Sequence, residues 1–296
     1  MTDIHRDFRA ELARRFRLDR ARTVSVQSAS DGTRKLLVAF QDGARVEAVL
    51  IPEPNRLTVC ISTQVGCSLN CTFCRTGTMR RERDLETWEI VEQVLAARRA
   101  WPERAVTNVV FMGMGEPLIN YDATVRAANI LIQDMGMNFS TRRVTISTAG
   151  IVPALRRLGR DTEVSVAISL HATTDETRTR LVPVNKKYPL KDLLAACRDY
   201  PLSNRRRITY EYVMLRGVND TPEDARRLVG LMAPLKAHVN LICFNPWEGC
   251  PYEPTPEPEI RAFQRVLLDA RVNTVVRRSR GQDILAACGQ LKAAHS

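Results

Sequence analysis

Strand-like and helix-like stretches alternate along the chain from residue 57 almost to its end. Short runs rich in branched apolar residues predict strands at 57–62, 108–112, 143–147, 164–170, 208–214, 239–244 and 273–277. Amphipathic segments between them predict helices at 87–99, 122–134, 152–158, 190–199, 222–235 and 257–270. This alternation predicts an α/β fold with a parallel sheet, either a barrel or an open sheet. A dinucleotide-binding fold has no support, because no G-x-G-x-x-G follows the first of these strands.

The first 52 residues follow another pattern, and we expect an N-terminal extension at 1–52 before a core domain at 53–296. Residues 1–22 predict a charged amphipathic helix. Its apolar face would carry Phe8, Leu12, Phe16 and Leu18. Residues 23–51 predict a small β unit, because strand-like runs flank a turn at 41–43.

Three cysteines stand close together directly after the first predicted strand of the core domain. Cys67, Cys71 and Cys74 have the spacing C-x3-C-x2-C. A structural zinc site normally takes four protein ligands, usually as two separated C-x2-C pairs, and the sequence has no second pair at such spacing. Three thiolates suit a 4Fe–4S cluster whose fourth iron stays open to a small ligand. A three-cysteine zinc knuckle and reduced core cysteines are the alternatives.

Polar residues and prolines gather where the predicted strands end. They are Glu116-Pro117, Ser147-Thr148, Ser169, His171 and Asn245-Pro246. In a β/α barrel the carboxyl ends of the strands form one rim, and the active site lies on that rim. Each of these residues alone is more typical of a turn or a surface, but in this order they predict one site.

Charge and composition narrow the class of protein further. The 296 residues carry a formal net charge of +11, with arginines in pairs and triplets such as 205–207. A basic chain has either a solvated basic surface or a polyanionic partner such as nucleic acid. No apolar run is long enough to span a membrane, and residues 1–17 do not form a secretory signal. Eight cysteines without the character of a disulfide scaffold fit a reducing compartment, so we expect a cytoplasmic protein.

Several longer motifs are distributed over most of the chain. They are Val46-Glu47, CISTQVGC at 60–67, FMGMGEPL at 111–118, VTISTAG at 144–150, SLHA at 169–172, NLICFNP at 240–246 and the C-terminal stretch at 280–291. With the cysteine triplet, these motifs resemble the RlmN/Cfr family of radical S-adenosylmethionine (SAM) RNA methyltransferases. The resemblance runs from about Asp31 to Leu291.

The resemblance implies both a fold and an activity. The fold would be a partial (β/α)6 barrel of the TIM type, with the N-terminal extension beside it. The activity would be methylation of an adenine carbon in 23S ribosomal RNA, and in some members also in tRNA. We expect C2 of adenosine as the target, and methylation of C8, as in the Cfr type, is the alternative.

The resemblance also implies how the cofactors are bound. Cys67, Cys71 and Cys74 would ligate one 4Fe–4S cluster, whose open iron would bind SAM. The remaining family positions around SAM match Gly115, Glu116, Ser147, Ser169, Leu170, His171 and Asn245. We further expect an electron donor such as flavodoxin, no membrane association and a monomeric enzyme.

Two further cysteines would carry the methyl group, again by resemblance. One SAM would methylate Cys288, and a second would yield the radical that removes hydrogen from that methyl group. The methylene would then bond to the adenine carbon, and Cys60 would release the product by forming a disulfide with Cys288. Glu47 matches a proposed base, although composition alone suggests a carboxylate on the surface of a strand. Read alone, each cysteine would be a buried and inert thiol.

Other readings remain open. The chain begins near the end of the helical domain with which typical members start, and Met1–Leu18 resembles only the last helix of that domain. Either the start codon is misplaced or RNA is recognised differently. A radical SAM enzyme acting on a peptide or metabolite is therefore one alternative. A non-catalytic iron–sulfur or zinc protein that binds RNA is another, and it would not need Cys288.

Overall fold

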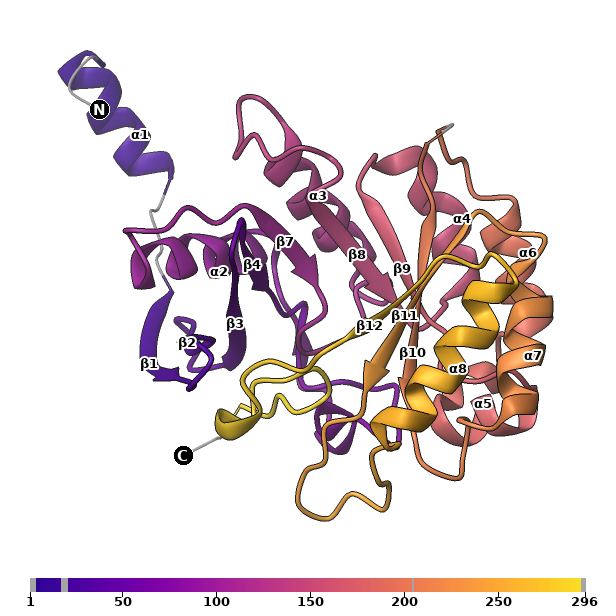
Figure 1. Ribbon diagram of the computed structural model, residues 1–296. Helices are drawn as coiled ribbons and strands as arrows, with labels where there is room; N and C mark the ends of the chain where they lie inside the picture. Colours follow the sequence, from indigo (N-terminus) through magenta and orange to yellow (C-terminus); the bar gives the residue numbers. More distant parts are fainter. Residues whose placement is uncertain (1–3, 17–20, 204, 294–296) are drawn as a thin grey trace.

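The computed structural model describes residues 4–16, 21–203 and 205–293, and most of its strands join in one sheet (Figure 1). The sheet has ten strands in the order β1-β2-β3-β4-β7-β8-β9-β10-β11-β12. Their bounds are β1 (Arg22–Ser28), β2 (Arg34–Ala39), β3 (Arg45–Glu53), β4 (Arg56–Cys60), β7 (Asn108–Phe111), β8 (Val144–Thr148), β9 (Ser165–Ser169), β10 (Ile208–Met214), β11 (Ala237–Cys243) and β12 (Thr274–Arg277). Strands β5 (Gln64–Val65) and β6 (Arg83–Asp84) form a separate pair.

The sheet changes from antiparallel to parallel at β4. Strands β1 to β4 pair antiparallel with one another, and every pair from β4 to β12 is parallel. Parallel neighbours need crossover connections, and helices supply them. The helices are α1 (Arg6–Arg15), α2 (Thr87–Ala100), α3 (Tyr121–Ile132), α4 (Val152–Asp161), α5 (Asp175–Leu181), α6 (Leu190–Arg198), α7 (Pro222–Met232) and α8 (Glu257–Asp269). Short 3-10 helices occupy Arg75–Thr78 (η1), Pro183–Lys186 (η2) and Gln282–Ile284 (η3).

Side chains alternate between the two faces of the curved sheet. One face packs against the helices, and the other is the inner face. In β10, the ring of Tyr212 packs outward on Phe263 of α8, with ring centroids 5.5 Å apart. The residues on either side of it, Glu211 and Val213, point to the opposite face, because successive side chains alternate. The sheet therefore buries one face under its helices and presents the other face to a cavity.

Local signals fix where the helices begin. Helix α7 starts with a capping box, in which the Thr221 hydroxyl accepts a hydrogen bond from the Asp224 amide at 3.1 Å and the Asp224 carboxylate accepts one from the Thr221 amide. Pro222 occupies the first helical position, where its missing N–H costs nothing. The predicted strands match the observed ones to within two residues at each end, and the helices predicted between residues 87 and 270 match to within three. The expected α/β partial barrel is confirmed.

The N-terminal helix departs from the prediction. Helix α1 ends at Arg15, because Phe16 is already extended with φ −124° and ψ 143°, and β1 begins at Arg22. It buries no residue, and it stands apart from the rest of the molecule (Figure 1). A short helix without tertiary packing gains little beyond its own hydrogen bonds. Leu18, assigned to its apolar face, lies outside the described residues.

The antiparallel strands continue directly into the parallel sheet. Strand β3 pairs with β4 from Val49 opposite Cys60 to Glu53 opposite Arg56. The boundary expected at residue 52 therefore falls inside a hydrogen-bonded ladder, and the division into two domains stays a prediction. None of the described helices is long and apolar enough to cross a lipid bilayer.

Candidate active site

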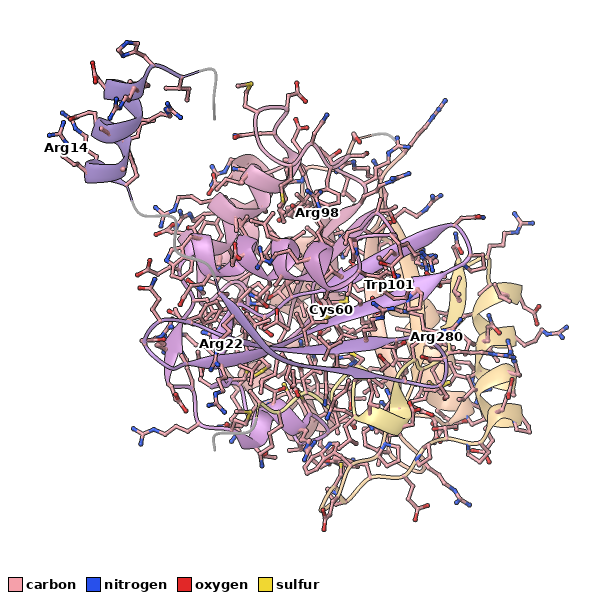
Figure 2. All side chains as sticks on the ribbon, turned by 90° about the vertical axis from the view of Figure 1, so that its left-hand side faces the viewer. Arg14, Arg22, Cys60, Arg98, Trp101 and Arg280 are labelled. Carbon is pink, nitrogen blue, oxygen red and sulfur yellow. The ribbon has the colours of Figure 1, made fainter. Side chains whose placement is uncertain are left out.

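A cavity of about 190 Å³ opens at the carboxyl ends of the parallel strands. Each strand of the parallel part contributes to its wall, for example β4 through Cys60, β9 through Ser169 and β12 through Arg277. Cys60 lies in the interior of the molecule (Figure 2). The predicted residues that line the cavity are Cys60, Cys67, Cys71, Cys74, Gly115, Glu116, Ser147, Ser169, His171 and Cys288. Glu47, Leu170 and Asn245 are not in its wall.

The loop that carries the cysteine triplet is held by other segments of the chain. Gly66 has φ +77°, and a Cβ there would lie 2.2 Å from the carbonyl oxygen of Arg80, so the sharp turn before Cys67 requires glycine. The Arg75 amide donates to the Gly289 carbonyl at 2.7 Å, and the Thr76 hydroxyl donates to the Leu291 carbonyl at 2.6 Å. These bonds attach the triplet loop to the C-terminal segment that contains Cys288.

The three thiols of the triplet suit a cluster better than a single metal ion. The described part of the chain contains no group of three His, Cys, Asp or Glu side chains that could hold one ion. In an iron–sulfur cluster the thiolates bind different irons, so they need not converge on one point. Burial raises the pKa of Cys67 to about 12 and raises that of Cys71 as well. A bound metal reverses this effect, because coordination deprotonates a thiol.

Glu116 is held by backbone amides at the end of β7. Its Oε2 accepts a hydrogen bond from the Ala149 amide at 2.8 Å, and its Oε1 accepts one from the Leu118 amide at 3.0 Å. A carboxylate has about four acceptor positions, so Glu116 keeps capacity for a ligand. The preceding Gly115 has φ +98°, and a Cβ there would meet the Gln64 side chain at 2.6 Å.

His171 is buried rather than on the surface, and its contacts fix its protonation. Its backbone has φ +59°, and Nδ1 accepts a hydrogen bond from the Val213 amide at 3.1 Å. Burial, helped by the nearby Arg178, lowers the pKa of His171 to about 3. The imidazole is therefore neutral near pH 7 and carries its proton on Nε2. Its ring stands edge-on to Phe73 of the triplet loop, with centroids 4.8 Å apart.

Sequence reasoning missed Arg178, which ties the ends of two neighbouring strands, β8 and β9, together. Its guanidinium is fully buried in α5 and donates to the carbonyls of Ala149, Ser169 and Leu170, at 2.6, 3.1 and 3.1 Å. A fourth bond, of 2.9 Å, goes to Asn185 Oδ1. The segment 175–181 is polar and lacks an apolar period, so nothing in it predicted a helix with a buried arginine.

Cys288 sits in a tight turn that faces the cavity. The Ala287 amide donates to Gln290 Oε1 at 3.2 Å, the Gln290 amide returns to the Ala287 carbonyl at 3.0 Å, and Gly289 follows with φ +83°. Asn245 Nδ2 donates to the Cys288 carbonyl at 3.2 Å. Residue 288 as a whole is exposed, and it forms part of the cavity wall. A reactant entering the cavity therefore meets this residue.

Cys60 and Cys288 approach the cavity from elements that are distant in sequence, and both are free thiols. Burial, with the Cys288 thiol nearby, raises the pKa of Cys60 to about 12, while the charge of Arg277 opposes the shift. Burial also raises the pKa of Cys288 to about 11, and Arg277 again opposes it. Arg277 is a second residue that the sequence did not single out.

Glu47 is not the surface carboxylate that composition suggested. It is buried in β3, where Oε1 lies 3.1 Å from Lys35 Nζ on the adjacent strand. Its Oε2 accepts a hydrogen bond from the Lys292 amide at 2.7 Å. The surface expectation was wrong because the partner that allows burial comes from another strand.

Comparison with known proteins places the chain among methyltransferases. A model of the radical SAM superfamily matches residues 61–229. The dual-specificity RNA methyltransferase RlmN of Geobacter sulfurreducens is 52% identical over 292 residues, which cover 99% of this chain and 80% of that protein. The enzyme of the same name from Pelobacter propionicus is 50% identical, with coverage of 99% and 84%.

Solved structures agree with the sequence comparison. A crystal structure of a radical SAM methyltransferase from Sphaerobacter thermophilus aligns with a TM-score of 0.93 at 45% identity, covering 99% of this chain and 87% of that one. The expected fold and the expected class of enzyme, a SAM-dependent methyltransferase, are thereby confirmed. The chain belongs to the RlmN/Cfr family of radical SAM methyltransferases.

Proposed function

We propose that the enzyme methylates C2 of an adenosine in RNA, with 23S ribosomal RNA and tRNA as substrates. The observation that carries the proposal is that Cys60 and Cys288 line the same cavity as the cysteine triplet. A metal-bound triplet alone would serve any radical enzyme. A second pair of thiols beside it suits a reaction in which one sulfur carries the methyl group and the other releases it.

In this proposal the chain divides the work among three sets of residues. Cys67, Cys71 and Cys74 hold three irons of a 4Fe–4S cluster. When bound, the cluster and SAM supply the hydrogen-atom abstraction that protein side chains cannot perform. The rim residues, Glu116 and His171 among them, orient SAM.

Cys288 carries the methyl group through the reaction. Its sulfur accepts a methyl from one SAM, and a second SAM is consumed in removing a hydrogen atom from that methyl. The resulting methylene radical would bond to the electrophilic adenine carbon, and the adduct would return one electron to the cluster that supplied it and lose the ring proton to a base. The Cys60 thiolate then attacks the Cys288 sulfur, the carbon–sulfur bond breaks, and the freed methylene takes up a proton to become the methyl group. The product leaves and a disulfide remains, which an external thiol reduces. Covalent relay of this kind divides one difficult step into easier ones.

Glu47 is the proposed base that removes the proton from the adduct. Both of its oxygens already have partners, in Lys35 and the Lys292 amide. To act as a base it must exchange one of them for the substrate, because proton transfer needs hydrogen-bond reach. RNA binding would displace the C-terminal segment around Lys292 in that case.

A basic surface near the cavity supports an RNA substrate. Arg277, Arg278 and Arg280 precede the Cys288 turn, with 45%, 80% and 42% of their side chains exposed. Arg22, Arg98 and Arg280, which are not in the cavity wall, are exposed residues labelled on the face shown in Figure 2. Phosphate contacts from such residues supply affinity without sequence preference. The name of the relatives, dual-specificity RNA methyltransferase, supports this assignment.

The proposal extends to the surroundings of the enzyme. All eight cysteines are free thiols, which is compatible with the reducing cytoplasm that we propose. We propose a monomer that receives its electron from a donor such as flavodoxin. Methylation at C8 is the second candidate. The two reactions share the cysteine relay and differ in how the adenine ring of the substrate is positioned.

Nucleoside mass spectrometry tests the proposal. The cluster is reconstituted without oxygen and supplied with SAM, a reductant and protein-free ribosomal RNA or tRNA. Digested RNA is compared with 2-methyladenosine and 8-methyladenosine standards. A 2-methyladenosine peak is the expected result. A peak of 8-methyladenosine would overturn the proposed regiochemistry. SAM cleavage without any methyladenosine would overturn the proposal that RNA is the substrate.

A further inference from the structure

One buried carboxylate in the cavity has an unused oxygen. Glu211 lies in the middle of β10 and is 3% exposed. Its Oε1 accepts a hydrogen bond from Asn240 Nδ2 of β11 at 3.0 Å. Its Oε2 is buried, and no residue in the described part of the chain gives it a hydrogen bond. Glu211 is in the wall of the cavity, so that oxygen is available to a ligand.

The nearest cation does not satisfy the carboxylate. Arg277 Nη1 lies 3.9 Å from Glu211 Oε1, which is beyond hydrogen-bond length, and the contact is to the oxygen that already has a partner. Buried polar atoms in native proteins almost always have a partner, and leaving one without is costly. A donor on a bound ligand would remove that cost, and the free protein would bear it only until the ligand binds.

The position of Glu211 identifies the part of the cavity that the ligand must occupy. Glu211 is the register partner of Ser169 in β9, and its carbonyl accepts hydrogen bonds from the Leu170 and His171 amides at 3.0 and 3.3 Å. Registered residues of parallel neighbours point to the same face and lie about 4.8 Å apart. A ligand that contacts the Ser169 side chain therefore also lies within reach of Glu211.

We propose that Glu211 binds the ribose of SAM, by accepting hydrogen bonds from its vicinal hydroxyl groups at Oε2. The inference rests on the proposed function, in which SAM occupies the rim that includes Ser169. A vicinal diol presents donors that a carboxylate recognises, as acidic residues do with the ribose of dinucleotides. The ammonium of the methionine part is less suitable, because that end of SAM would meet the cluster that the cysteine triplet would hold.

Binding measurements on the cluster-loaded enzyme test this inference without requiring turnover. The ligands are S-adenosylhomocysteine and its 2′,3′-dideoxy analogue, titrated calorimetrically in the absence of oxygen. The proteins are wild type, Glu211→Gln and the control Glu92→Gln. Glu92 is also a buried carboxylate, but it pairs with Arg99 on α2 and is outside the cavity wall. Cluster absorbance and the unfolding temperature establish that each variant is loaded and folded.

We expect the change in the protein, Glu211→Gln, and the change in the ligand, removal of the ribose hydroxyls, to lower the affinity by a similar factor. Glu211→Gln should weaken S-adenosylhomocysteine about 10- to 100-fold, since hydrogen bonds to a charged group are the strong ones. The dideoxy analogue should bind wild type more weakly by a similar factor and should bind Glu211→Gln no worse than it binds wild type. Glu92→Gln should bind S-adenosylhomocysteine as wild type does.

Three outcomes would overturn the inference. Unchanged affinity in Glu211→Gln would do so, including the case in which only RNA binding falls and the adenine amino group of the substrate is the donor. Equal weakening of both ligands by Glu211→Gln would show that the hydroxyls are not recognised. Failure of wild type to bind S-adenosylhomocysteine would overturn the proposed function together with this inference, and the first two outcomes leave the proposed function standing.

Discussion

The side-chain amide of Asn245 donates a hydrogen bond to the backbone carbonyl of Cys288 over 3.2 Å. Asn245 follows β11, and its Oδ1 is in turn held by Gln282 Nε2 at 2.7 Å. The end of a barrel strand thus sets the position of the turn that presents the thiol. Because the Gly289 carbonyl of the same turn binds the Arg75 amide, the thiol is also fixed relative to the cysteine triplet.

The proposed methyl carrier can be tested by replacing its sulfur. Cys288→Ser should lower RNA methylation by at least about 10³-fold, because an alcohol cannot serve as the sulfur carrier. The reconstituted cluster should keep its absorbance, since the triplet is untouched. Cys243→Ser, which changes a thiol outside the cavity wall, is the matched control and should stay active. Substantial methylation by Cys288→Ser, measured by nucleoside mass spectrometry, would contradict the carrier assignment.

Removing Cys60 should stop the reaction one step later. Cys60→Ala can still form the bond between Cys288 and the adenine carbon but has no thiolate to release it. We expect an RNA–protein adduct that survives denaturing electrophoresis and that peptide mass spectrometry maps to Cys288. Cys197→Ala, a buried cysteine away from the cavity, should give no adduct. If Cys60→Ala released free methylated RNA over many turnovers, product release by disulfide formation would be excluded.

The release step should accelerate as pH rises. Burial raises the pKa of Cys60 to about 12, so the thiol is protonated near neutrality and only a small fraction attacks. Below the pKa, the thiolate fraction grows about tenfold for each unit of pH. Rapid-quench measurements of adduct decay between about pH 6.5 and 8.5 should therefore rise with a logarithmic slope near one. In the adduct Cys288 is no longer a thiol, so it no longer raises the pKa of Cys60. Burial still raises that pKa. A rate independent of pH would exclude Cys60 deprotonation from this step.

Arg178 should prove to be a structural requirement of the rim. Arg178→Met leaves the carbonyls of Ala149, Ser169 and Leu170 buried without their donor, which should cost about 3 kcal/mol of unfolding free energy. Arg156→Met removes an exposed ion pair with Asp199 and should change stability by less than about 0.5 kcal/mol. Urea unfolding of the two variants measures the difference. Equal unfolding free energies of the two variants would mean that the buried guanidinium of Arg178 does not stabilise the rim.

Local patterns predicted the elements and the triplet, and long-range partners decided what was missed. Strand 208–214 was predictable from its apolar run, but its single carboxylate, Glu211, was indistinguishable from a solvated residue until β9 and β11 enclosed it. Composition alone suggested a surface position for Glu47, because its partner Lys35 belongs to another strand. Cys60 and Cys288 were paired only through family resemblance, since no spacing rule relates residues so far apart.

The most direct test of the cysteine relay follows the hydrogens of the methyl group. The enzyme is supplied with SAM whose methyl group carries three deuterium atoms, and the methyladenosine product is weighed by mass spectrometry. If Cys288 loses one hydrogen atom from its methyl before the carbon bonds to adenine, the product must contain two deuterium atoms and one hydrogen from elsewhere. A product with all three deuterium atoms would mean direct polar transfer, and it would contradict the relay on which this account depends.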